Sequence, residues 1–210
     1  MVRRELNKNT VGIILAGGLS RRMGQDKSSK KIGGTSLIEI ITKRSEKQVG
    51  QIIINSNKPR SHFSNLNYDD LVEDCIPGGL GPMAGILTGI KWTRKNTKKK
   101  WLCSFPVDSP FFPKDLVLNF LKKSKGSEVL VAEGSGRIHP VFSMWSVNME
   151  MERKIEKSLR DGLRKIYEIS KKFKTKVVKF PDIGYDPFFN VNTPKDLEIA
   201  YKIQTTFKVN

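Results

Sequence analysis

A glycine-rich loop that carries several cations follows the first apolar stretch of the chain, residues 11–15. The loop holds three glycines and three cations: Gly17, Gly18, Gly24, Arg21, Arg22 and Lys27. Glycine lets a backbone approach a ligand closely and adopt a positive φ, and bunched backbone N–H groups beside cations bind phosphates. The loop therefore predicts a polyphosphate site, and the alternative is an ordinary turn on a basic surface. Its spacing fits neither the P-loop nor the dinucleotide-binding fingerprint.

A second candidate for chemistry is Asp108, which follows another apolar stretch at residues 101–105. It stands in the sequence Phe-Pro-Val-Asp-Ser-Pro, at the expected end of a strand. One carboxylate, completed by waters and substrate phosphates, is the usual way in which proteins hold Mg²⁺. Asp108 is therefore a candidate magnesium ligand, and the alternative is a capping or turn residue in a proline-rich loop.

A second glycine-rich loop, residues 76–85, leads into an expected helix whose first turn contains Pro82. Its small residues and the orphan N–H groups of the helix start suit either a nucleotide or close helix packing. Nearby, Asn55 ends an expected strand and Asp74 precedes this loop. Taken alone, both are as well explained as capping or turn residues.

These candidate residues require a scaffold of alternating strands and helices. Strands are expected at residues 11–15, 51–55, 71–73, 101–105, 128–132, 141–145 and 176–180, and helices at 36–47, 82–92, 114–122, 149–158, 161–170 and 193–203. The segment 57–70 is expected to be a surface loop. Such alternation predicts a three-layer α/β sandwich with a mostly parallel, Rossmann-like sheet. Ligands of such sheets bind beyond the carboxyl ends of the strands, where the candidate loops lie.

The length of the chain favours one domain over residues 1–210, and its composition bears on the ligands that it could bind. The formal net charge is +17, which would suit nucleic acid. However, the lysine runs at 98–100, 122–123 and 171–172 fall in expected turns or helix ends, without interleaved aromatic side chains. Nucleic-acid binding is therefore not expected, although a basic surface attracts anionic nucleotides.

The two cysteines and two histidines do not have metal-ligand spacing. Cys103 lies in an apolar strand pattern and is expected in the core, whereas Cys75 adjoins the second glycine-rich loop. We expect a cytoplasmic protein without structural disulfides. No apolar run is long enough for a membrane span, and no secretory leader is recognisable.

The chain resembles the molybdenum cofactor guanylyltransferases, the MobA family of the nucleotidyltransferase superfamily. Five blocks carry the resemblance, in the family's order: Leu15–Lys27 (Leu-Ala-Gly-Gly-x-Ser-x-Arg-Met-Gly-x-Asp-Lys), Gly81–Gly85 (Gly-Pro-x-Ala-Gly), Pro106–Pro110 (Pro-x-Asp-x-Pro), His139–Phe142 (His-Pro-Val-Phe) and Phe188–Leu197 (with Asn-x-Asn-Thr-Pro at its centre). One departure stands at Thr35-Ser36, where the family usually has Lys-Pro. A basic residue is lost there, and Lys30 or Lys31 is a candidate substitute.

The resemblance implies a role for each candidate residue. Binding of the nucleotide is implied for Leu15, Ala16, Gly17, Gly18, Lys27, Asn55, Asp74, Gly81 and Asp108. Catalysis is implied for Arg22, Lys27 and Asp108, with Asp108 also holding Mg²⁺. Contact with the pterin substrate is implied for His139, Asn190 and Asn192. From the residues alone, His139 before a proline is more often structural, and the two asparagines could equally hold a turn together.

The reaction that the resemblance implies is transfer of GMP from GTP to molybdenum-bearing molybdopterin, with release of pyrophosphate. Proteins that deliver or accept the molybdenum cofactor are then candidate partners. One alternative is a cytidylyltransferase acting on molybdopterin, or on another small phosphorylated acceptor. Such cytidylyltransferases have Leu-Ala-Ala-Gly in the first block and lack Gly-Pro-x-Ala-Gly, so this sequence favours guanine. A more remote alternative is a non-catalytic module that binds nucleotide or nucleic acid.

Overall fold

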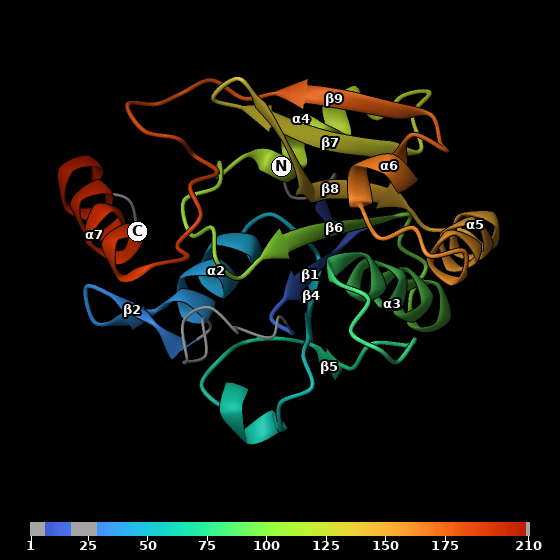
Figure 1. The fold of residues 1–210 in the computed structure, drawn as a ribbon, viewed down its shortest axis with the longest axis horizontal. Coiled ribbons are helices and arrows are strands. Elements are labelled where there is room, and N and C mark those ends of the chain that lie inside the picture. Colours follow the sequence, from blue (N-terminus) through green and yellow to red (C-terminus); the bar gives the residue numbers. More distant parts are fainter. Residues whose placement is uncertain (1–6, 18–28, 209–210) are drawn as a thin grey trace.

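A seven-stranded sheet forms the centre of the computed structural model, which describes residues 7–17 and 29–208 (Figure 1). Its strands are β1 (Thr10–Leu15), β4 (Gln51–Asn55), β5 (Asp70–Val72), β6 (Trp101–Pro106), β7 (Val129–Gly134), β8 (Arg137–Ser146) and β9 (Thr175–Lys179). Their order in space is β5-β4-β1-β6-β8-β7-β9, and of these seven strands β8 alone runs antiparallel to its neighbours. The predicted mostly parallel sheet is therefore confirmed.

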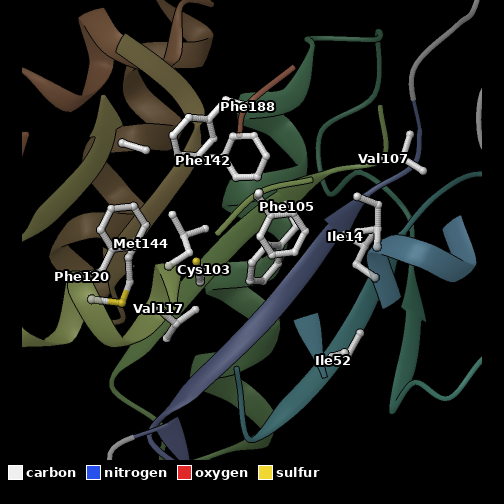
Figure 2. Close-up of a cluster of buried hydrophobic side chains, with 14 of the residues drawn as sticks. Ile14, Ile52, Cys103, Phe105, Val107, Val117, Phe120, Phe142, Met144 and Phe188 are labelled. Carbon is white, nitrogen blue, oxygen red and sulfur yellow. The ribbon is translucent and has the colours of Figure 1, made fainter. Parts of the chain in front are cut away.

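Helices cover both faces of this sheet and complete the predicted three-layer sandwich. They are α2 (Leu37–Ser45), α3 (Pro82–Asn96), α4 (Leu116–Lys123), α5 (Met149–Arg160) and α6 (Ile166–Ser170), whereas α7 (Pro194–Phe207) packs in a third apolar cluster, whose described members all lie outside this sheet. Apolar residues of α2 and α4 pack on one face of the sheet, and those of α3, α5 and α6 pack on the other. The side chains of β1 alternate between the two cores, with Ile14 in the first and Ile13 in the second, because successive strand residues point to opposite faces. Figure 2 shows part of the first core, around Ile14, Phe105 and Phe142.

Two helices begin with capping boxes. Ser36 accepts the Glu39 N–H, and the Glu39 carboxylate accepts the Ser36 N–H at 2.8 Å. Thr193 and Asp196 form the same arrangement at the start of α7, with Pro194 in the first turn. The predicted cap at Thr193 is confirmed. At Thr35-Ser36, where the sequence departs from the family pattern, Ser36 caps α2 with its hydroxyl, which a proline at that position could not do.

The helix predicted at residues 161–170 is wrong in its first half. α5 ends at Arg160, the Gly162 N–H donates to the Leu159 carbonyl, and Gly162 has a φ of 87°. A glycine in this left-handed conformation terminates a helix, so the chain turns before α6 begins at Ile166.

A short hairpin, β2 (Lys31–Ile32) and β3 (Thr35–Ser36), is absent from the sequence-based prediction. It turns at Gly33 and Gly34, whose φ values of 55° and 88° suit a two-residue hairpin turn. Ile32 is buried in a third cluster with residues of α7, and Figure 1 shows α7 beside β2 at one side of the molecule. The exposed Lys31 lies on this hairpin, outside the sheet edge that carries the other candidate residues.

The predicted surface loop at 57–70 contains a 3-10 turn, η2 (Arg60–Phe63), which places Phe63 fully in the first core. Cys103 is buried, as predicted, and burial raises the pKa of its thiol. Cys75 is exposed. Within residues 7–17 and 29–208, no helix has the length and apolar character needed to cross a bilayer.

Candidate functional site

The carboxyl ends of β4, β1 and β6 are neighbours at one edge of the sheet, and hydrogen bonds join the loops that leave them. The Ala16 N–H donates to the Asn55 carbonyl at 2.9 Å, and the Val107 N–H donates to the Leu15 carbonyl at 3.3 Å. Leu15, Ala16 and Gly17 therefore lie at this edge, as expected. In this conformation the Ala16 N–H is used to join the loop after β1 to the end of β4.

Three of the residues predicted in the first loop, namely Gly18, Arg22 and Lys27, lie outside the described residues.

Asn55 and Asp74 form a hydrogen-bonded pair. The buried Asn55 amide donates to Asp74 Oδ1 at 3.0 Å and to the Val72 carbonyl at 3.3 Å. On its other side, Asn55 Oδ1 faces Gly85 of α3 so closely that a Cβ on Gly85 would lie 2.4 Å from it. The two predicted residues are thus brought together, and Asn55 uses its amide donors to hold the loop after β5 to the end of β4, beside α3.

The second glycine-rich loop ends at Gly81, which precedes the first residue of α3 and has a φ of 79°. The loop is anchored at its other end, where the Cys75 N–H donates to Thr88 Oγ1 at 2.8 Å. Gly81 is exposed, and α3 begins beside the Asn55–Asp74 pair. A helix start favours an anionic ligand through its dipole. In α3, however, Pro82 has no N–H, Met83 is buried, and the Ala84 N–H donates to the Gly81 carbonyl at 3.0 Å.

Asp108 and the Asn190–Asn192 segment are far apart in the sequence but adjacent in the structure. The Asp108 carbonyl accepts the Val191 N–H at 2.7 Å, and the Ser109 hydroxyl donates to Asn190 Oδ1. Asp108 is half-buried, whereas Asn190 and Asn192 are exposed. The Asn192 N–H donates to the Asp196 carboxylate of the α7 capping box at 2.9 Å. These contacts support the interpretation that both asparagines hold the turn, while leaving their outer surface open to a substrate.

His139 lies on β8 and packs against Phe188, which shortly precedes the Asn190–Asn192 segment. Its ring stacks on Phe188 with 4.5 Å between the ring centres, and Nε2 lies 3.2 Å from the Gly134 carbonyl. Burial lowers the pKa of the His139 imidazole and outweighs the opposing effect of the hydrogen bond to Gly134. Phe188 in turn packs against Phe142, as Figure 2 shows. The packing fixes the start of the Asn190–Asn192 segment.

The donor chemistry at Asp108 fits a magnesium ion. Among the residues that the structure describes, no three His, Cys, Asp or Glu side chains cluster as a metal cage. Asp108 presents a single, half-buried carboxylate at the end of β6. Mg²⁺ keeps several of its waters and is commonly held by one or two carboxylates together with substrate phosphates.

Sequence reasoning missed three polar residues that shape this site: Ser109, Arg44 and Gln48. Arg44 and Gln48 continue the spacing of Leu37 and Ile41, and both are buried, Arg44 in the last turn of α2 and Gln48 in the turn that follows it. Polar residues in an apolar helical stripe signal buried hydrogen-bond partners, and this signal was present in the sequence. The Ser109 contact has no such signal, because its partner lies on a distant loop.

A mostly parallel sheet with glycine-rich loops and an aspartate at the carboxyl edge of its strands is typical of nucleotide-binding α/β proteins. More particularly, the chain belongs to the family of MobA-like NTP transferase domains, whose model matches residues 12–175. It is therefore a nucleotidyltransferase.

A curated relative supports this assignment, and solved structures share the fold. A molybdenum cofactor guanylyltransferase of Rhodopseudomonas palustris (strain BisB5) is 33% identical over 198 residues, which cover 92% of this chain and 93% of the relative. The crystal structure of molybdopterin-guanine dinucleotide biosynthesis protein A from Archaeoglobus fulgidus covers 93% of this chain and 99% of its own, with a TM-score of 0.70 and 21% identity. A structure of Rv0371C from Mycobacterium tuberculosis in complex with manganese covers 92% and 98%, with a TM-score of 0.63 and 13% identity. The two structures share the fold of this chain.

Proposed function

We propose that this chain transfers GMP from GTP to the terminal phosphate of molybdenum-bearing molybdopterin, releasing pyrophosphate and forming the guanine dinucleotide form of the cofactor. The curated relative matched over almost its whole length is named for this activity. The structural observation that supports the proposal is the contact between the Asp108 loop and the Asn190–Asn192 segment, because the residues proposed to bind the nucleotide and the acceptor are adjacent there.

The chemistry needs little more than positioning and charge neutralisation. An oxygen of the acceptor phosphate forms a bond to the α-phosphorus of GTP, and the bond from that phosphorus to the bridging oxygen of the β-phosphate breaks. The attacking oxygen is already anionic, so no general base is required. Arg22 and Lys27 stabilise the triphosphate and the leaving pyrophosphate, while the Gly17–Gly18 backbone and the start of α3 at Gly81 hold the nucleotide.

Family membership implies use of a divalent metal ion, and we propose that it is Mg²⁺ held by Asp108. When bound, the ion would neutralise phosphate charge and orient the nucleotide. Asn55 and Asp74 serve the nucleotide side through the hydrogen bond that fixes the loop before α3.

The acceptor side is formed by His139, Asn190 and Asn192. The side-chain carbonyl oxygen of Asn190 accepts a hydrogen bond from the Ser109 hydroxyl, so the amide of this exposed residue is the group that would donate to the pterin. His139 supports this surface through Phe188. We further propose one nucleotidyltransferase domain over residues 1–210, acting in the cytoplasm and supplying its product to proteins that deliver or accept the molybdenum cofactor.

The identity of the base gives the direct test of this function. Purified protein with Mg²⁺ and molybdenum-bearing molybdopterin should use GTP with a kcat/KM at least about tenfold higher than that for CTP, because a site that hydrogen-bonds one base leaves polar groups unpaired with another. Pyrophosphate release and mass spectrometry of the dinucleotide measure both rates. Equal or better use of CTP would assign the chain to cytidylyl transfer, and no product with any nucleotide would support a binding module.

The close approach of Gly85 to Asn55 gives a second test with a matched control. A Cβ on Gly85 would lie 2.4 Å from Asn55 Oδ1, whereas a Cβ on Gly89, one turn along α3, would lie 2.8 Å from Ile13 and Leu102 in the core. Gly85→Ala and Gly89→Ala should both lower the free energy of unfolding by about 1–3 kcal/mol, as overpacking does. Only Gly85→Ala should also weaken GTP binding to the folded protein, by about tenfold, the effect of losing one hydrogen-bond partner.

Urea unfolding and titration calorimetry with GTP measure the two effects separately. Equal GTP affinity in the two variants would remove the Asn55–Asp74 pair from the nucleotide site.

A further inference from the structure

Arg44 is a buried cation on α2, a helix that contributes none of the nucleotide-binding, catalytic or acceptor residues predicted from the sequence. It lies in the last turn of α2 and is only 6% exposed. Its Nε–H donates to the Phe112 carbonyl, and its Nη2–H donates to the Phe111 carbonyl at 3.1 Å. The guanidinium also lies over the Phe112 ring, 5.6 Å from its centre. Burying a charge is costly unless it is well hydrogen-bonded, so this arrangement needs a reason beyond core packing.

Both carbonyls belong to the loop that carries Asp108. Only Ser109 and Pro110 separate Asp108 from the first of them, and Pro110 restricts the backbone between them. Gln48, in the turn that follows α2, holds the next part of the same loop. Its amide donates to the Pro113 carbonyl at 3.0 Å, and its carbonyl oxygen accepts the Val117 N–H at 3.2 Å. Arg44 and Gln48 together therefore fix the backbone that follows Asp108.

Arg44 also reaches the loop that carries Asn190 and Asn192. Its guanidinium forms a hydrogen bond with the Tyr185 hydroxyl. The Tyr185 ring packs edge-on against Phe111 with 5.9 Å between the ring centres. The two loops meet again at the bond from the Val191 N–H to the Asp108 carbonyl. One guanidinium thus contacts both of the loops whose junction forms the proposed site.

We propose that Arg44 is a positioning residue for nucleotidyl transfer, which keeps the Asp108 loop and the Asn190–Asn192 loop in the arrangement that the reaction needs. The planar fork of an arginine can serve two carbonyls and a hydroxyl at once, whereas a lysine offers a point charge. The role of Arg44 in catalysis rests on the proposed function, but its hold on the two loops, here called the Arg44 clamp, is a property of the folded chain. One experiment tests the clamp, and a second tests its effect on nucleotide binding.

The first experiment measures amide hydrogen exchange by NMR, without nucleotide. In Arg44→Lys and Arg44→Met, the Val191 amide should exchange at least about tenfold faster than in the parent, while amides of α5 change by less than about twofold, because the opening is local. Arg94→Met is the control, since Arg94 pairs with Glu152 at 2.8 Å at the far end of α3. It should leave Val191 unchanged. Unchanged Val191 exchange in both Arg44 variants, or equal acceleration in α5, would overturn the proposal.

The second experiment is a double-mutant cycle on GTP binding at saturating Mg²⁺, measured by calorimetry. Arg44→Lys should weaken binding by about tenfold in the parent but by less than about twofold in the Asp108→Asn variant, because residues that act through one another are not additive. Equal effects in the two backgrounds would overturn the positioning role. If the parent forms no dinucleotide or binds no GTP, the proposed function fails, and the exchange experiment alone decides whether the clamp exists.

Discussion

Asp108→Asn is expected to remove most of the magnesium-dependent rate while leaving the fold intact. The substitution is nearly isosteric, and the Asp108 carbonyl keeps its bond to Val191, since that bond involves only the backbone. Loss of a metal-held charge clamp raises the barrier by several kcal/mol, which corresponds to a fall in kcat of about 10³-fold or more. Initial rates of pyrophosphate release across a Mg²⁺ titration measure this loss.

Asp115→Asn is the matched control, because Asp115 is an exposed carboxylate further along the same connection, directly before α4. Its rate and its Mg²⁺ dependence should stay within about twofold of the parent, as for a surface charge. Near-normal activity of Asp108→Asn, with the parent's Mg²⁺ dependence, would place the metal ligand elsewhere.

The second large effect is expected for Lys27→Ala in the first glycine-rich loop. If Lys27 binds the triphosphate directly, its loss should cost about 2–4 kcal/mol of barrier, similar to the loss of one preorganised donor at developing charge. That corresponds to a fall of about 10²–10³-fold in kcat/KM for GTP. The measurement is made at low and at moderate salt, because salt weakens long-range attraction much more than direct contact.

Lys99→Ala removes the same charge at the opposite edge of the sheet. Lys99 precedes β6, and its ammonium donates to the Lys8 carbonyl, whereas Asp108 follows the carboxyl end of the same strand. This variant should stay within about twofold of the parent, as a screened surface charge does. If both variants lose activity slightly and to the same extent, the glycine-rich loop is not the triphosphate site.

The positions of the other lysines help to interpret the comparison of Lys27→Ala with Lys99→Ala. The lysine runs at 98–100, 122–123 and 171–172 lie after α3, at the end of α4 and after α6, as the sequence predicts. Cations at helix ends interact favourably with the helix dipole. Seven of the 38 lysines and arginines belong to these runs, and they therefore lie at or shortly after helix ends, where they attract anions without selecting between nucleotides.

The sequence by itself determined the strands and helices whose signals are local. β4 was predicted at its observed limits, and α3 and α7 were predicted from Pro82 and from Thr193-Pro194, because caps and prolines act on their immediate neighbours. The same locality explains the error at residues 161–170. The apolar spacing continues through Gly162, but a glycine with φ of 87° ends the helix, and the sequence alone does not reveal that conformation.

Placement of the candidate residues at one edge followed from the sequence as well, since parallel strands bring their carboxyl ends together. Their partners were decided only by the tertiary structure. The bonds from Asn55 to Asp74, from Val191 to Asp108 and from Arg44 to the Phe111 and Phe112 carbonyls join segments separated by whole strands and helices. A polar side chain can satisfy its hydrogen bonds in many ways, and which partner it meets depends on the strand order and helix packing that the complete fold imposes.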